Sequence, residues 1–258
     1  MSVITAKDNP KIKKVTALVN SAKRRKESGV FVLEGVRLCS EALRETLKVK
    51  ELYYTNSAEQ SNKNLILKLM QKAEYYSEVS NEVFLKMSDT SSPQGILLTV
   101  EKFSPQIDMQ SGRWLAFERI ADPSNLGAAA RTAEALGFSG IILSKSGVDP
   151  FSPKSLRASM GALLRLPVIV CENFSQTLTQ MKTNGFTLSG TVVNSDAQKI
   201  NEINFSEKEV AVIGNEANGL TDEIKAVCDR LVTIPMSGRA ESLNAATAAA
   251  VVMWEMVR

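Results

Sequence analysis

In the second half of the chain, short runs of apolar residues alternate with segments of helical periodicity, and this alternation constrains the fold more than any other feature. The runs Trp114–Glu118, Gly140–Leu143 and Val210–Ile213 are largely apolar, as in strands buried on both faces. Such strands, separated by helices, predict a mostly parallel sheet whose ligands bind beyond the carboxyl ends of the strands. The pattern predicts strands at 114–118, 140–143, 166–170, 186–188, 210–213 and 231–234, and helices at 125–136, 154–164, 175–182, 221–227 and 244–257.

The first half predicts a smaller α/β domain. Apolar residues recur at a spacing of three or four over Ile12–Val19, which predicts a helix over 10–26, and Gly29 is placed to end it. Strands are predicted at 30–33, 49–54, 74–77 and 95–100, with further helices after Gly35, at 65–72 and at 81–87. We therefore expect one α/β domain over residues 1–105, a linker at 106–112 and a second α/β domain over 113–258.

Composition excludes several classes of function. The chain has no histidine, so Ser-His-Asp and Cys-His triads and His-ligated metals are absent. Its three cysteines, Cys39, Cys171 and Cys228, form no C-x-x-C pair, so we expect neither a disulfide framework nor a zinc site, and no metal. The apolar stretch Ala245–Trp254 is shorter than the roughly 18–20 residues of a membrane span. With no apolar segment near the N-terminus that resembles a secretory signal, a cytoplasmic location away from membranes is expected.

Positive charge is concentrated near the N-terminus. Residues 1–37 hold nine basic and three acidic residues, although the net charge of the whole chain is only +3. A basic segment on a nearly neutral body favours a face that binds a polyanion; the alternative is a solvated helix surface with surplus lysines. The candidate RNA-binding residues are Lys11, Lys14, Lys23, Arg24, Arg25, Lys26 and Arg37.

Three loops that leave predicted strand ends carry the polar residues of the second half. The first, 121–127, runs into a helix with Arg131, which could simply pair with Glu134 at i,i+3. The second, 214–221, has the glycine spacing of a phosphate-binding loop, but Leu220 stands where that motif requires lysine. The third, 234–244, ends at Asn244, which could be only a helix N-cap.

Taken together, in this order, the three loops resemble the motif set of the SpoU (TrmH-type) branch of the SPOUT RNA methyltransferases. The first half is similar to the substrate-binding domain often attached to that family, on the stretches 31–37 and 92–95. The matching segments are Asp122-Pro123-x-Asn125-Leu126-Gly127-x-x-x-Arg131-Thr132-Ala133, Gly214-x-Glu216-x-x-Gly219-Leu220, and Ile234-Pro235-Met236 followed by Ser242-Leu243-Asn244.

The resemblance implies a C-terminal domain whose mostly parallel sheet is tied into a trefoil knot, with S-adenosylmethionine held by the knot's loops. It also implies a homodimer with the last helix at the interface and an active site shared between subunits. The implied catalytic residues are Asn125, Arg131, Glu216, Ser242 and Asn244. The implied cofactor-binding residues are Leu188, Ser189, Gly190, Thr191, Gly214, Asn215, Gly219, Ile234, Met236, Ser242 and Leu243.

The implied reaction transfers the sulfonium methyl group of S-adenosylmethionine to a ribose 2′-hydroxyl of RNA. Because the chain carries a full N-terminal domain, ribosomal RNA is favoured over transfer RNA, and large-subunit 23S RNA over small-subunit RNA. A transfer-RNA enzyme remains an alternative, as does a catalytically silent RNA-binding or ribosome-assembly factor with the same fold. A dehydrogenase would predict a G-x-G-x-x-G fingerprint, which the sequence lacks.

Overall fold

The computed structural model describes residues 3–45, 47–103 and 108–258, and these divide into two compact units. Unit 1 comprises Met1–Ser104 with Phe151–Leu164, and unit 2 comprises Pro105–Pro150 with Arg165–Arg258. The predicted boundary at 105–106 and the start of the predicted linker lie outside the described residues. The sequence-based division did not anticipate that residues 151–164, which connect two strands of unit 2, belong to the compact body of unit 1.

Unit 1 is built on a four-stranded sheet in the order β1-β4-β2-β3. The β1/β4 and β4/β2 pairs are antiparallel, and β2/β3 is parallel. The apolar face that the sequence predicts on α1 is buried, with Ile12 and Val15 both fully inaccessible and packed with Val32 and Leu97. The elements are α1 Pro10–Asn20, α2 Ala22–Ser28, β1 Val30–Glu34, α3 Val36–Arg44, β2 Val49–Tyr54, α4 Asn56–Ser61, α5 Lys63–Lys72, β3 Tyr75–Glu78, α6 Asn81–Met87, β4 Ile96–Glu101, α8 Pro153–Ser159 and the first residues of α9 Ala162–Arg165.

The helix predicted over 10–26 is two helices. Ser21 is extended, with φ −134° and ψ 112°, and its side chain accepts a hydrogen bond from the Arg24 backbone N, so it caps α2. The apolar residues that supported the prediction, within Ile12–Val19, all lie in α1, so they carried no information about the break at Ser21. The predicted stop is confirmed, since Gly29 takes the left-handed conformation at φ 64°.

Three further differences from the predicted elements have local causes. The helix predicted at 154–164 breaks into α8 and α9 because Met160 and Gly161 have φ 52° and 96°. The short polar helix α4 was not predicted, because it lacks apolar periodicity. Its start is marked in the sequence only by Thr55, whose side chain caps the helix by accepting a hydrogen bond from Ala58 N. The two-residue strand β9 is too short to give a pattern.

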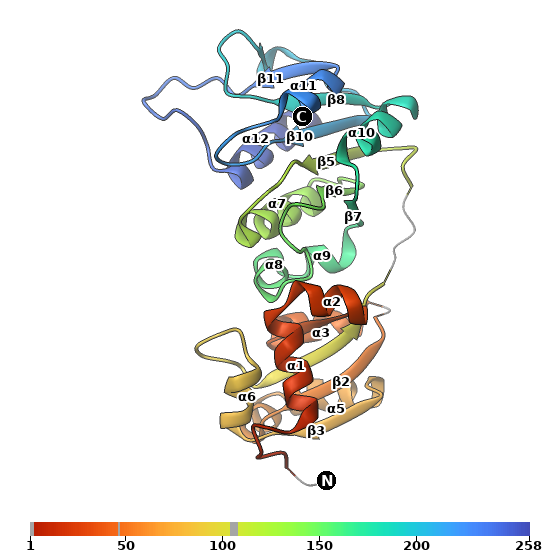
Figure 1. The fold of residues 1–258 in the computed structure, drawn as a ribbon, viewed down its shortest axis with the longest axis vertical. Helices are drawn as coiled ribbons and strands as arrows, with labels where there is room; N and C mark the ends of the chain where they lie inside the picture. The colour runs from red at the N-terminus through yellow and green to blue at the C-terminus, as the bar shows by residue number, and fades with distance from the viewer. Residues whose placement is uncertain (1–2, 46, 104–107) are drawn as a thin grey trace. The chain divides into compact units, whose positions relative to one another are not determined.

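Unit 2 is built on a seven-stranded sheet in the order β7-β6-β5-β10-β8-β11-β9, and every recorded pairing is parallel. The predicted parallel sheet is thus confirmed. Helices α7 and α12 contact each other, and α12 also contacts β10 (Figure 1). The elements are β5 Arg113–Phe117, α7 Pro123–Ala135, β6 Gly140–Ser144, β7 Val168–Cys171, α10 Phe174–Thr183, β8 Thr187–Thr191, β9 Gln198–Lys199, the 3-10 helix η1 Ile200–Glu202, β10 Glu209–Ile213, α11 Asp222–Val227, β11 Arg230–Thr233 and α12 Ala245–Val257.

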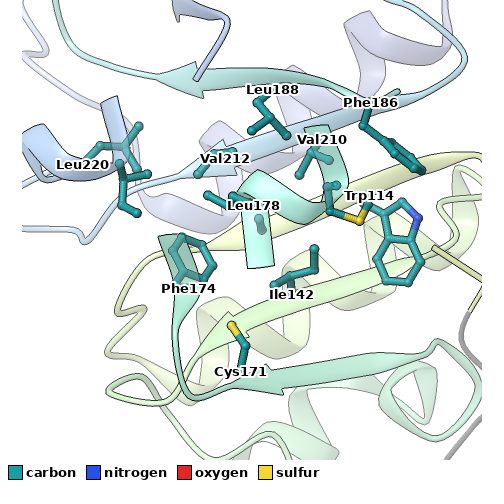
Figure 2. Close-up of a cluster of buried hydrophobic side chains, with 13 residues drawn as sticks. Trp114, Ile142, Cys171, Phe174, Leu178, Phe186, Leu188, Val210, Val212 and Leu220 are labelled. Atoms are coloured by element: carbon teal, nitrogen blue, oxygen red, sulfur yellow. The ribbon is translucent and has the colours of Figure 1, made fainter. Parts of the chain in front are cut away.

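One face of this sheet packs on α10 and α11 (Figure 2). Trp114 and Val212 from the strands meet Phe174 and Leu178 from α10 in a single buried cluster. Residues such as Leu115 alternate with these along the strands, point to the opposite face, and are equally buried. The strands are therefore covered on both sides, as their continuous apolar runs predicted.

Candidate active site

The three loops singled out by sequence all leave carboxyl ends of parallel strands. Loop 1 follows β5 and comprises residues 118–122, because residues 123–127 of the predicted loop 121–127 form the start of α7. Loop 2 (residues 214–221) follows β10, and loop 3 (residues 234–244) follows β11. Strands β5 and β10 are neighbours, while β8 lies between β10 and β11. Because parallel strands end at one edge of a sheet, the loops gather there, which is the edge where ligands of such sheets bind.

A chain of hydrogen bonds joins one residue from each motif. Asn244 Nδ2 donates to Asn125 Oδ1 at 2.9 Å, and Asn125 Nδ2 donates to Glu216 Oε1 at 3.0 Å. Glu216 Oε2 accepts from the Ala121 backbone N at 3.2 Å. These polar groups come from positions 91 and 119 residues apart in the sequence, so the fold itself builds the cluster.

The network keeps Glu216 ionised. Partial withdrawal from water acts to raise the pKa of Glu216, but hydrogen bonds from Asn125 and from the backbone amides of loop 1 outweigh it. The pKa of Glu216 therefore lies below its ordinary value. Glu216 is an acceptor of hydrogen bonds here, and it carries a negative charge at neutral pH.

Capping fixes the ends of the two helices that carry these residues. Asp122 caps α7 by accepting from Ser124 N at 2.8 Å, and Pro123 occupies the first turn. Asn244 caps α12 by accepting from Ala246 N at 2.9 Å. Asn244 is thus both a helix N-cap and a member of the polar network. Its Oδ1 caps α12, while its Nδ2 donates to Asn125.

Loop 2 is held by backbone and amide contacts. Asn215 Oδ1 accepts from Ala217 N and Asn218 N, and Asn215 Nδ2 donates to the Arg119 carbonyl at 2.8 Å. A Cβ on Gly214 would meet the Gly219 carbonyl carbon at 2.2 Å, so this position needs glycine. The loop therefore has a defined shape, with little freedom at Gly214.

A cleft opens between the loops after β8, β10 and β11. Its two adjoining compartments have volumes of about 340 Å³ and 600 Å³ and share the segments 191–194 and 241–243. The smaller compartment is bounded by loop 3, and the larger by loop 2, including Glu216. The sequence-predicted residues that line the cleft are Thr191, Gly214, Asn215, Gly219, Ile234, Met236, Ser242 and Leu243.

Three predicted cofactor-binding residues lie inside the protein instead. Leu188 belongs to the buried cluster of Figure 2, and Ser189 is fully buried with its Oγ donating to Glu209 Oε1 at 2.5 Å. A Cβ on Gly190 would meet Cys228 Sγ at 2.9 Å, so this glycine serves packing. Their strand reaches the cleft only at its last residue, Thr191.

Arg131 is exposed on α7 and lies outside the residues that line the cleft. The ion pair with Glu134 that the sequence left open does not form. Glu134 Oε2 instead accepts from Arg165 Nη2 at 2.8 Å, and its other oxygen accepts from Arg165 Nε. Asn125 and Arg131 share one helix, but Arg131 takes no part in the Asn125–Glu216 network.

The predicted RNA-binding residues separate into two kinds. Arg25 is only 4% exposed, and its Nη1 donates to the carbonyls of Leu18 at 2.5 Å and Val19 at 2.9 Å. Arg25 therefore completes the end of α1, and its prediction as a phosphate-binding residue is corrected: a guanidinium buried against its own backbone is not presented to a ligand. The others, Lys11, Lys14, Lys23, Arg24, Lys26 and Arg37, are exposed.

Several cleft residues were missed from the sequence. Lys225 lines the larger compartment, and Glu241 and Val193 line both; Val193 is 74% exposed. Glu241 directly precedes the predicted site residue Ser242 in loop 3, so the sequence could have indicated that it lies at the cleft. Val193 and Lys225 lie outside every motif, and only the folded chain brings them to the cleft.

The described residues contain no group of three or more His, Cys, Asp or Glu side chains that could hold a metal ion. Among those same residues, no helix combines the length and apolarity needed to cross a membrane.

Comparison with known proteins assigns both halves of the chain. Residues 113–254 match the SpoU rRNA Methylase family, and residues 9–98 match the MRM3-like substrate binding domain. An uncharacterized tRNA/rRNA methyltransferase of Synechocystis is 35% identical, over 99% of this chain and 93% of its own length. The Bacillus subtilis 23S rRNA (guanosine(2553)-2′-O)-methyltransferase RlmP is 29% identical, over 99% of both chains.

A solved structure is similar over the whole chain. The AdoMet-bound rRNA methyltransferase from Sinorhizobium meliloti has 29% identity and a TM-score of 0.87, covering 99% of this chain and 97% of its own. The family expected from the three loops is confirmed by these matches. The chain belongs to the SpoU rRNA Methylase family, and it carries an MRM3-like substrate binding domain in its N-terminal half.

Proposed function

We propose that this protein transfers the methyl group of S-adenosylmethionine to a ribose 2′-hydroxyl of ribosomal RNA, with large-subunit 23S RNA as the favoured substrate. The observation that carries the proposal is the Asn244–Asn125–Glu216 network, which lies at the carboxyl edge of the sheet beside a two-compartment cleft. The 23S rRNA 2′-O-methyltransferase RlmP, which aligns over 99% of both chains, supports 23S RNA as the substrate and the ribose 2′-oxygen as the acceptor.

The residues of the cleft suit S-adenosylmethionine. Ile234, Met236 and Leu243 offer apolar surface for a flat adenine ring, and the backbone at Gly214 allows close approach because no Cβ stands there. We infer that Thr191, Asn215, Gly219 and Ser242 complete this site. The bound cofactor would supply an electrophilic methyl group, so the protein's remaining task is to prepare the ribose hydroxyl.

Arg131 is our candidate for that task. A ribose hydroxyl is almost un-ionised at neutral pH, so its attack needs alignment and stabilisation of the negative charge that develops on oxygen. The guanidinium of Arg131 is planar and positively charged, and it is therefore suited to bind phosphate and to stabilise the alkoxide. Asn125, Ser242 and Asn244 would position the hydroxyl, with Glu216 holding the amide of Asn125 in one orientation.

We further propose that the protein works as a cytoplasmic homodimer with α12 at the interface. Residues 245–254 contain no charged side chain, and Trp254 remains 57% exposed in a single chain. An exposed tryptophan on an apolar helix favours burial against a second copy. A dimer would also allow the exposed Arg131 of one subunit to serve the cleft of the other.

Mapping of 2′-O-methylated nucleotides in total RNA, from cells with and without the gene, tests the proposal. We expect one ribosomal position to lose its methyl group and to regain it when purified protein and S-adenosylmethionine are added. Loss of a transfer-RNA methyl group would favour the tRNA alternative. An unchanged methylation map together with defective ribosome assembly would favour a catalytically silent factor.

A further inference from the structure

Two carboxylates line the cleft, Glu216 and Glu241. Both oxygens of Glu216 already accept hydrogen bonds, one from Asn125 and one from the Ala121 amide. Glu241 has no recorded hydrogen bond or ion pair within the described part of the chain. Glu241 is therefore the acid of the cleft whose charge remains available to a ligand.

The lysines that line the cleft do not neutralise the negative charge of Glu241. Lys199, in the smaller compartment, lies 3.3 Å from Glu202, and Lys225, in the larger, lies 3.0 Å from Asp222. Each lysine is thus paired with an acid close to it in sequence, and neither acid lines the cleft. The local charge that Glu241 presents to a ligand is accordingly negative.

Glu241 is also placed where the middle of a long ligand would lie. It lines both compartments, together with Ser242 and Leu243, whereas Ile234 lines only the smaller and Gly214 only the larger. A ligand that spans the two compartments must pass the segment 241–243. In S-adenosylmethionine, the middle of the molecule is the ribose and the positively charged sulfonium; after methyl transfer the sulfur is neutral.

We infer that Glu241 makes the cleft select the positively charged cofactor over its neutral demethylated product. This inference rests on the proposed function, because it takes the cleft to be the S-adenosylmethionine site. A carboxylate attracts the sulfonium through space and gains nothing from the neutral thioether, so its effect falls on one ligand only. Release of the product after each turnover would be favoured by the same difference.

Calorimetric titration of the full-length protein tests this without RNA or turnover. Wild type and Glu241→Gln are each titrated with S-adenosylmethionine, with S-adenosylhomocysteine, and with the cofactor analogue that carries a protonated amine in place of the methylsulfonium. We expect Glu241→Gln to weaken binding of both cationic ligands by roughly five- to twenty-fold and to leave S-adenosylhomocysteine binding unchanged. The wild-type preference should also shrink at high salt, as for any partly exposed charge pair.

Glu223→Gln is the matched control, because Glu223 is an exposed acid of unit 2 that lies outside both compartments. It should leave all three affinities at their wild-type values. An equal loss for cationic and neutral ligands in Glu241→Gln would overturn the inference and assign Glu241 to the ribose or to the shape of loop 3. Unchanged affinities would overturn it as well. A wild-type protein that binds the cofactor but methylates no RNA would instead refute the proposed function alone.

Discussion

At the scale of single residues, the question for Arg131 is whether it takes part in methyl transfer or only forms an ion pair on the surface. Its neighbour Glu134 is engaged by Arg165, so a surface ion pair does not account for the arginine. We expect Arg131→Ala and Arg131→Lys to fold and to bind S-adenosylmethionine normally, yet to lose about 10²–10³ in the single-turnover rate of methyl transfer. Lysine keeps the charge but loses the planar fork of the guanidinium, so it should rescue little.

The control for Arg131 is Arg165→Ala, which removes the ion pair with Glu134. Exposed pairs of this kind contribute only about 0–1 kcal/mol to the free energy of unfolding, so turnover should stay close to wild type. Methyl transfer at the wild-type rate by Arg131→Ala would contradict the assignment of this residue to the chemistry.

Arg25 shows the opposite case, a basic residue of a charged run that serves the fold. Its side chain satisfies two carbonyls at the end of α1, so Arg25→Ala leaves them without that donor. We expect the free energy of unfolding to fall by about 1–3 kcal/mol in urea denaturation. Arg24→Ala, at a neighbouring exposed position, should change it by no more than about 0.5 kcal/mol. Equal stability of the two variants would show that Arg25 contributes no more than its neighbour.

At the scale of elements, the prediction that the N-terminal half binds RNA is tested on helix α2. Lys23, Arg24 and Lys26 are exposed on this helix, and Lys23 and Arg24 share a single nearby acid, Glu27, at 3.8 Å and 3.6 Å. Each phosphate contact contributes roughly 0.7–0.9 to the slope of log affinity against log salt. We expect replacement of all three by serine to flatten the slope by about 2–3 in RNA-binding titrations, with cofactor binding intact.

The double variant Lys63→Ser/Lys68→Ser is the comparison for α2, since both lysines are exposed on α5. It lowers the net charge of unit 1 without touching α2. A slope that changes in proportion to the number of charges removed, whichever helix they come from, would mean that α2 has no specific contact with RNA.

At the scale of the whole molecule, unit 1 contains part of the chain that the SpoU match covers. Phe151 lies 5.0 Å from Phe31 between ring centroids, and Leu156 and Leu163 are almost fully buried. We expect a fragment of residues 106–258 to expose these side chains and to bind a hydrophobic dye more strongly than the full chain. Its cleft lies entirely in unit 2, so calorimetry should still record micromolar-scale cofactor binding, about −8 kcal/mol. A fragment with dye binding as low as that of the full chain would contradict the first expectation.

The proposed dimer is tested through Trp254. Tryptophan is enriched among interface hot spots, whose truncation costs about 2 kcal/mol or more of binding free energy. We therefore expect Trp254→Lys to halve the mass measured by sedimentation at low micromolar concentration. Val170→Lys, at an exposed apolar position of the edge strand β7, should leave the mass unchanged. A wild-type protein that already sediments as a monomer would refute the interface.

The sequence by itself determined the features that depend on neighbouring residues. Apolar runs located the strands of unit 2, Gly29 ended α2, and the loop motifs identified the family, because periodicity, capping and left-handed glycines are local properties. The trefoil knot and the dimer come from the resemblance and stay predictions. The cofactor contacts of Leu188–Gly190 come from that resemblance too and stay predictions, although strand β8 places these residues in the core.

Only the tertiary structure decided which distant surfaces meet. It paired Glu134 with Arg165 rather than Arg131, and it turned Arg25 inward from a run that looks uniformly solvated. It also placed residues 151–164 in unit 1 and brought Glu241 into both compartments of the cleft. Each outcome depends on the complementary shape and polarity of segments far apart in the chain, and a local pattern carries no information about its partner.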